Sequence, residues 1–281
     1  MEFFEALRDN PLIRNAVLAG LLASVACGIM GTYVVARRIT YVAGGISHAV
    51  LGGIGAALYV QKVHRWPGLD PLYGAVAAAI AAALVIGYVN IRARQREDTV
   101  IGAVWAIGVA TGVLFISRTP EFSQDIMSYL FGNILMVSAR DLWLMALLDA
   151  LVVGAGLLLY NQFQAVCFDE EFADVRGLRV KAYYLLLLCI VALTVVLLVT
   201  VVGIVMVIAL LTLPAAVAGQ FSKTLARMMG LAVAFSAVFT FAGLAISYQP
   251  DLPSGATIVV LAGATYLAVT AALSMLRRHR G

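Results

Sequence analysis

Two titratable side chains lie inside long apolar segments and are the first candidates for chemistry. His48 follows Ser47 within residues 41–61, and Asp149 lies within residues 141–160. An ionisable group is costly to bury in hydrocarbon, so it usually faces a helix interface or a polar cavity. Neutral imidazole is a common ligand of transition metals, and a buried carboxylate needs a partner, a proton or a cation. Ser47, His48 and Asp149 are therefore candidates for contact with a metal ion or another substrate; the alternative is a structural role between helices.

The sequence carries no motif of the common enzyme classes. The glycine-rich segment 44–55 lacks the Lys-Ser/Thr pair that grips phosphate in a P-loop. The patterns His-Glu-x-x-His, Gly-x-Ser-x-Gly and Cys-x-x-Cys do not occur either. We therefore expect the chain not to be an enzyme and to bind no cofactor of its own. Any ATP hydrolysis has to come from another polypeptide.

The composition places these residues in a membrane protein. Of the 281 residues, 63% are hydrophobic and 12% are charged, whereas a soluble domain has about 25% charged residues. The mean hydropathy of +0.98 describes the whole length, which excludes a soluble body on a single anchor. Soluble enzymes, nucleic-acid-binding modules, secreted disulfide scaffolds and disordered chains are excluded as well. We predict one all-α, polytopic domain over residues 1–281, in contact with lipid and without a nucleic-acid partner.

The apolar segments predict nine membrane-spanning helices, because a bilayer core of about 30 Å needs roughly 20 apolar residues per helix. The predicted spans are 12–36, 41–61, 72–91, 99–117, 141–160, 183–202, 204–221, 229–249 and 257–276. An eight-span count is the alternative, since residues 183–213 form one uncharged run that only Gly203 divides. Pro214, inside the next span, removes a backbone hydrogen bond and favours a kink. Gly203 and Pro214 are candidate hinge or packing positions.

Basic residues give the orientation of these spans. Five hydrophilic joints on one side of the nine-span arrangement hold 13 of the 19 Lys and Arg residues. Because Lys and Arg accumulate in cytoplasmic loops, that side is cytoplasmic. The C-terminus then lies inside and the N-terminus outside. Residues 125–140, on the external side, are apolar but too short to cross, and we expect a short helix that lies at the outer face or dips into the membrane beside a cavity.

The longest cytoplasmic connection, residues 161–182, is expected to contain a short docking helix. Acidic residues begin at Asp169 and Glu170, and Gly177 follows. A helix from Glu170 to Val175 would have acids in its first turn and glycine near its C-cap, and both placements are favourable.

Several segments together resemble the membrane permease subunits of ABC importers for zinc, manganese or iron. The resemblance covers nearly the whole chain, and its specificity comes from the order and spacing of the segments. They are Gly28 to Arg38, Ser47-His48-Ala49 followed by Gly52, Asp98-Thr99-x-Ile101-Gly102, Ser128 to Leu135, Phe168-Asp169-x-x-Phe172-Ala173-x-x-x-Gly177, and Leu210 to Ala216.

The resemblance implies a type II-like permease in the plasma or inner membrane of a bacterium or archaeon. It implies a homodimer with the path on the two-fold axis, two cytoplasmic ABC ATPase subunits that bind ATP, and an extracytoplasmic metal-binding protein. The cargo would be a divalent zinc, manganese or iron cation. The loop would then be a coupling helix on the ATPase, with five residues in this role: Asp169, Glu170, Phe172, Ala173 and Gly177.

One position departs from the family. Members often carry Asp four residues before the histidine of the second span, where both side chains share a helix face, and here that position is Gly44. Either other spans complete a site around His48, or this chain handles its ion differently. A metal chelate or other small solute is therefore an alternative cargo. A proton-coupled secondary transporter with Asp149 as its coupling acid is a further alternative.

Overall fold

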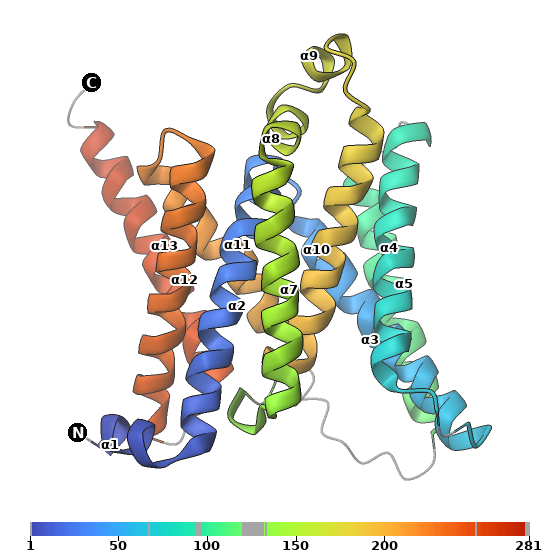
Figure 1. Ribbon diagram of the computed structural model, residues 1–281, viewed down its shortest axis with the longest axis vertical. Coiled ribbons are helices and arrows are strands. Elements are labelled where there is room, and N and C mark those ends of the chain that lie inside the picture. Colours follow the sequence, from blue (N-terminus) through green and yellow to red (C-terminus); the bar gives the residue numbers. More distant parts are fainter. Residues whose placement is uncertain are drawn as a thin grey trace.

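The nine predicted spans are confirmed by a computed structural model of the chain, which describes residues 2–66, 68–93, 97–119, 132, 134–250 and 252–278. Within these residues, nine helices are long and apolar enough to cross a membrane. They are α2 (Pro11–Ala36), α3 (Thr40–Val63), α4 (Pro71–Ala93), α5 (Glu97–Ser117), α7 (Ala139–Leu158), α10 (Val180–Val202), α11 (Ile204–Phe221), α12 (Leu225–Tyr248) and α13 (Ser254–Arg278). The chain ends lie at opposite ends of the bundle, as an odd number of crossings requires (Figure 1).

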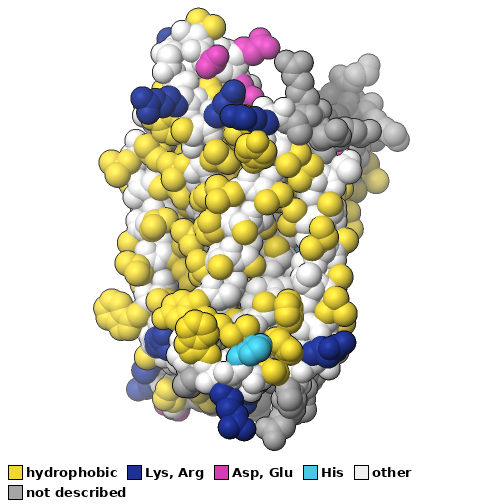
Figure 2. Space-filling view, turned by 90° about the vertical axis from the view of Figure 1, so that its right-hand side faces the viewer, with side chains coloured by type: hydrophobic (Ala, Val, Ile, Leu, Met, Phe, Trp, Pro, Cys, Tyr) yellow, Lys and Arg dark blue, Asp and Glu magenta, His cyan; other side chains and the backbone are white. Residues whose placement is uncertain are grey.

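The surface of the bundle is consistent with a surrounding membrane. Hydrophobic side chains form a broad band around the middle of the face drawn in Figure 2, and charged side chains lie toward its two ends. Large apolar side chains such as Leu114, Leu158 and Val260 are well exposed on the outer helices. In water this exposure would be costly, whereas lipid accepts it without penalty.

The helices form an inner and an outer group. Most residues of the spanning windows of α2, α3, α10 and α11 are buried, whereas α5, α7 and α13 are largely exposed. α2 packs against α12, α11 and α7, while α3 packs against α5 and α4. His48 and Ser47 therefore lie on an inner helix, and Trp105 of α5 covers His48.

Local capping decides where several helices begin. Thr224 caps α12, since its Oγ1 accepts a hydrogen bond from the backbone N–H of Arg227 at 3.3 Å. This cap starts α12 at Leu225, four residues before the predicted span. Ser138 and Asp141 form a reciprocal capping box at the start of α7, which satisfies backbone donors that a helix N-terminus leaves free.

Gly203 separates two helices, as the sequence predicts. Its φ of +84° ends α10 at Val202, and α11 begins at Ile204. This backbone conformation is open to glycine and strained for other L-residues. Pro214 is buried within α11, which continues through it to Phe221.

The external ends differ in part from the prediction. Half of the predicted short helix 125–140, namely residues 125–131 and 133, lies outside the described part. Its end is a 3-10 turn, η1 (Ile134–Met136), which packs on α2 and precedes the first residues of α7. The N-terminal helix α1 (Glu2–Asp9) buries Phe3 against Phe241 and Tyr248 of α12, with ring centroids 5.8 and 5.7 Å apart.

Glycine allows α3 and α4 to approach with backbones in contact. A Cβ atom added at Gly53 would lie 2.2 Å from the carbonyl oxygen of Gly74, and one added at Gly74 would lie 2.3 Å from that of Gly53.

We expect Gly53→Ala to push the two helices apart and lower the thermal midpoint of the purified protein by several degrees, as over-packing by about 1–3 kcal/mol implies. Gly154→Ala is the matched control, since nothing lies within 4 Å of its added Cβ. Equal midpoints for the two variants would contradict this packing.

Candidate functional site

His48 lies in α3 beneath an aromatic cover. Its imidazole stacks on the indole of Trp105 in α5, with ring centroids 4.4 Å apart and an interplanar angle of 21°. Its Nδ1 atom is buried and has no hydrogen-bond partner in the described structure. Ser47 is fully buried, and its hydroxyl donates to the carbonyl of Ala43 at 2.7 Å. Of the pair, His48 has a free ligand atom, whereas Ser47 satisfies its donor within its own helix.

A membrane cavity of about 570 Å³ adjoins this aromatic cover. Its walls come from the end of α2 and from α3, α5, α11 and α13, and they include Arg38, Gly44, Trp105, Thr212 and Tyr266. A Cβ at Gly44 would meet the edge of the Trp105 ring at 2.9 Å. Glycine at position 44 therefore gives Trp105 the room to lie across the cavity wall, between this space and His48.

A second cavity of about 480 Å³ lies toward the end of the bundle that the sequence predicts to be external. Asp70, Arg140 and Asp141 line it together with apolar residues of α3, α7 and α10. Both carboxylates are already engaged in helix capping. Asp70 accepts a hydrogen bond from Leu72 N at 2.9 Å, and Asp141 accepts one from Ser138 N at 3.0 Å. The chemistry of a metal ligand set is thus not evident here.

Asp149 lies apart from both cavities. It is 8% exposed and sits at the contact of α7 with α2, where its neighbours are Ala26 and Cys27. Neither carboxylate oxygen has a hydrogen-bond partner among the described residues. Its place in a helix interface supports the packing interpretation of this residue over a position on a path.

The described residues of a single chain do not assemble a complete transition-metal site. They contain no group of three or more His, Cys, Asp or Glu side chains arranged to hold a metal ion. His48 contacts α5, whereas Asp149 contacts α2. The three residues that the sequence singled out therefore divide into His48 beside a cavity, Ser47 bonded within α3, and Asp149 at a separate interface.

The predicted docking helix has the expected bounds. α9 spans Glu170–Val175, and the Asp169 carboxylate caps it by accepting from Phe172 N at 2.9 Å. Gly177 adopts φ +77°. Its N–H donates to the carbonyl of Asp174 at 2.8 Å, and Leu178 N–H donates to that of Ala173 at 3.1 Å. These two bonds form a Schellman ending, which requires a left-handed residue at position 177.

α9 presents an apolar tip away from the bundle. Val175 is 88% exposed and Phe172 is 53% exposed, whereas Ala173 is fully buried within the chain. The guanidinium of Arg176 covers one face of Phe172, at 4.7 Å from the ring centroid. Exposed apolar side chains at the end of a bundle, beyond its hydrophobic band, indicate a protein-binding surface. Ala173 can support this surface only from beneath.

Sequence reasoning missed a helix that carries α9. The first half of the predicted loop 161–182 forms α8 (Tyr160–Phe168), which buries Phe163, Val166 and Cys167. Phe163 meets Tyr33 of α2 edge-on, with ring centroids 5.3 Å apart. The spacing of these three apolar residues at positions i, i+3 and i+4 was a helical signal in the sequence.

Comparisons with known proteins agree with this architecture. A family model described as "ABC 3 transport family" matches residues 9–273. A probable metal transport system membrane protein of Chlamydia pneumoniae is 42% identical over 93% of this chain and 88% of that protein. The manganese transport system membrane protein MntC of Listeria monocytogenes is 34% identical, over 93% and 91% of the two chains. The structure of PsaBC from Streptococcus pneumoniae in complex with Fab aligns with a TM-score of 0.83, at 28% identity, over 95% of this chain and 94% of that one.

Proposed function

Because the chain belongs to the ABC 3 transport family, we propose that it is the permease through which an ATP-driven importer carries a divalent metal cation. Like its relatives, the chain is a transporter subunit and not an enzyme. Manganese is the first candidate among manganese, zinc and iron, because the name of the Listeria relative specifies it. The proposed location is the plasma or inner membrane of the cell.

The observation that carries this proposal is the exposed apolar tip of α9 at one end of a membrane bundle. Phe172 and Val175 protrude there, and a capped N-terminus and a Schellman turn fix the helix that holds them. A short rigid helix of this kind can insert into a groove of a cytoplasmic ATPase and move with it. Asp169, Glu170 and Gly177 would set its geometry, Phe172 would make contact, and Ala173 would support it from within.

The path would form between two copies of the chain. The cavity beside Gly44 and Trp105 is lined in part by α5 and α13, the two described spans with the smallest buried shares. Pairing across this face would close the cavity and bring two His48 imidazoles toward a common axis. Because the described residues of one chain form no group of three ligands, a ligand set around His48 shared by two chains would hold a transition metal briefly and then release it.

Cargo would enter from the external end, delivered by an extracytoplasmic metal-binding protein. The external cavity near Asp70 and Asp141 supports an entrance there. A metal chelate is the second candidate cargo, and the lack of a three-ligand group among the described residues favours it. Proton-coupled transport through Asp149 has less support, since that side chain lies at the α2–α7 contact and lines neither cavity.

The proposed function is tested by purifying the tagged chain from its native membrane in mild detergent. We expect one ABC ATPase chain to accompany each permease chain. Val175→Asp should remove the ATPase, because a charge at the tip opposes burial of an apolar side chain in a groove. The Val175→Asp permease should itself remain folded, since the side chain of Val175 is almost fully exposed. Vesicles that contain the wild-type permease and its ATPase should accumulate Mn²⁺ only when ATP is supplied. An excess of the chelated ion should not reduce this uptake of free Mn²⁺.

Two results would contradict the proposal. The first is that no ATPase accompanies the wild-type chain even after gentle crosslinking. The second is that vesicles containing the chain alone take up the ion and that a proton gradient drives this uptake. Competition by the chelate and not by free Mn²⁺ would keep the ABC assignment and replace the cargo.

A further inference from the structure

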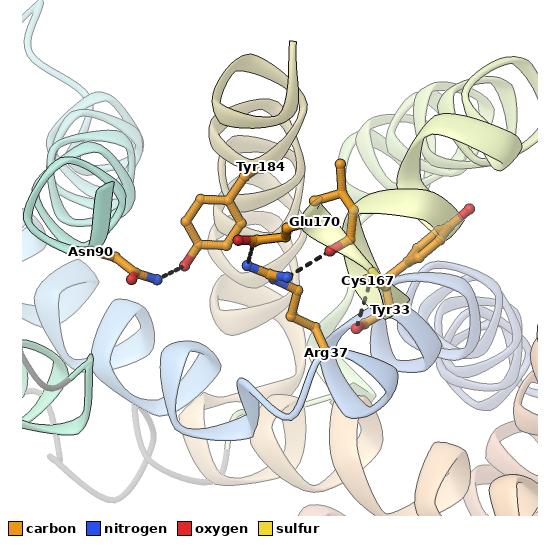
Figure 3. Close-up of polar contacts among 7 residues, drawn as sticks. Tyr33, Arg37, Asn90, Cys167, Glu170 and Tyr184 are labelled. Atoms are coloured by element: carbon orange, nitrogen blue, oxygen red, sulfur yellow. Dashed lines mark hydrogen bonds and ion pairs between the residues drawn. The ribbon is translucent and has the colours of Figure 1, made fainter. Parts of the chain in front are cut away.

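The side chain of Arg37, the C-cap of α2, meets three consecutive helices from a distant part of the sequence (Figure 3). Its Nη1 donates to the carbonyl of Val166 in α8 at 2.6 Å, and its Nη2 forms an ion pair with the carboxylate of Glu170 in α9. The guanidinium carbon lies 4.7 Å from the ring centroid of Tyr184 in α10. One planar cation thus contacts α8, α9 and α10 from the end of α2.

The contacts extend to a further membrane helix. The hydroxyl of Tyr184 accepts a hydrogen bond from the Asn90 side chain of α4 at 2.9 Å. On the other side, Cys167 of α8 lies against the carbonyl of Tyr33, one turn before Arg37 in α2, with sulfur and oxygen 4.0 Å apart. Arg37 therefore stands between the α8–α9 unit and the membrane helices α2, α10 and α4.

Arg37 is well suited to hold α9 in place. Its side chain is 16% exposed, whereas that of Glu170 is 48% exposed. A free surface ion pair contributes little to stability because two flexible side chains must be ordered and water screens them. Here the carbonyl of Val166 and the ring of Tyr184 already fix the guanidinium, and its rigid plane serves all three contacts at once. Glu170 therefore meets a preorganised partner.

α9 has few other attachments to the bundle. It packs mainly against α8, with a smaller contact to α10. α8 in turn rests on α2 and α10. The pair of Glu170 with Arg37 links α9 directly to α2, whereas the other contacts of α9 reach α2 through α8 or α10.

We propose that Arg37 is a positioning residue that ties the docking helix α9 to α2 and α10, so that movement of α9 is transmitted to the membrane helices. This inference rests on the proposed function. It differs from the ordinary role of a cytoplasmic arginine, which is to fix orientation by charge. Lysine retains that charge but loses the planar fork, so Arg37→Lys separates the two roles.

The first test measures the attachment in the purified chain, without any ATPase. Cys167 is a built-in probe, because it is buried between α8 and α2. Burial raises the pKa of its thiol to about 12, while Arg37 lowers it. Removing Arg37 therefore cannot speed labelling by creating thiolate, since the pKa of Cys167 would rise further. Faster labelling of Cys167 in Arg37→Ala by a charged maleimide would report only that α8 has loosened.

We expect Arg37→Ala to label at least about tenfold faster at pH 7.5, the scale of losing a charge-assisted hydrogen bond. Peptide mass spectrometry assigns the label to Cys167. Arg227→Ala is the matched control, since it removes an exposed arginine from the first turn of α12 and should label as the wild type does. Unchanged labelling in Arg37→Ala would overturn the attachment.

The second test measures coupling in the reconstituted transporter. We expect Arg37→Ala to retain its ATPase subunit and hydrolyse ATP, while the number of Mn²⁺ ions carried per ATP falls severalfold. Arg37→Lys should show an intermediate loss, and Arg227→Ala should show none. A purely structural role would lower the amount of folded protein and leave the ratio of ions to ATP unchanged.

The outcomes separate the two proposals. An unchanged ratio in Arg37→Ala, or wild-type behaviour of Arg37→Lys in both tests, would overturn the positioning role while the permease assignment stands. A wild-type chain that binds no ATPase would overturn the proposed function and, with it, the coupling role of Arg37. The labelling test would still decide whether Arg37 holds α8 and α9.

Discussion

We expect replacement of Gly177 by valine to remove most ATP-driven uptake and to leave the membrane bundle folded. Gly177 has φ +77°, and its N–H closes the Schellman turn that ends α9. A non-glycine residue in this conformation costs roughly 1–2 kcal/mol, and a β-branched one is disfavoured further. A shift of this size changes a local equilibrium by about 5–30-fold. The docking helix would then be correctly ended in only a minority of molecules.

The effect of Gly177→Val should be conformational and not steric within the chain. Nothing lies within 4 Å of a Cβ added at position 177. Asparagine tolerates the left-handed region, so Gly177→Asn should retain more uptake than Gly177→Val. Gly154→Val is the matched control, because its added Cβ also meets nothing within 4 Å and its position lies inside α7. Uptake of labelled Mn²⁺, ATPase co-purification and the thermal midpoint are measured together.

Normal uptake by Gly177→Val with the ATPase still bound would refute the docking role of α9. Equal losses in Gly177→Val and Gly154→Val would point to general damage to the bundle. A lower thermal midpoint for Gly177→Val alone would place the strain outside α9. Each result is distinct from a change in cargo, because Gly177 follows α9 and does not line the cavity beside Gly44.

We expect His48→Ala to reduce Mn²⁺ uptake by at least about tenfold, the lower end of the loss caused by removing a supporting partner of a metal site. The buried Nδ1 of His48 lacks a hydrogen-bond partner in the described structure, so it is available as a ligand. ATP hydrolysis should continue, because His48 lies inside α3 and α9 remains intact. The loss should appear as a higher Mn²⁺ concentration for half-maximal uptake.

The control for His48→Ala is His64→Ala. His64 is exposed at the C-terminal end of α3, and its ring centroid lies 6.0 Å from that of Tyr59. It should transport normally. Trp105→Ala, which uncovers the imidazole, should change the half-maximal concentration without changing the docking of the ATPase. If His48→Ala keeps normal uptake and loses thermal stability, the stack on Trp105 is a packing contact and the path lies elsewhere.

The sequence alone determined the spans and the bounds of α9, and it predicts the orientation of the spans. Long apolar runs, basic joints and the sequence from Asp169 to Gly177 are local features, and membrane insertion and helix capping depend on local features. For this reason Gly203 was placed correctly as a break, and Glu170–Val175 as a helix. The start of α12 was predicted too late, because the prediction used the length of the apolar segment and did not consider the N-cap at Thr224.

Only the tertiary structure decided which candidate residues meet. His48 stacks on Trp105, Asp149 lies against α2, and Arg37 contacts α8, α9 and α10. Ala173, chosen as a docking residue, proved to be buried in its own chain. These contacts join segments that lie more than fifty residues apart in sequence, and no local pattern encodes such a pairing. The packing of the helices determines these contacts. Each inner helix has several faces made of small residues, and any of these faces could pack against another helix.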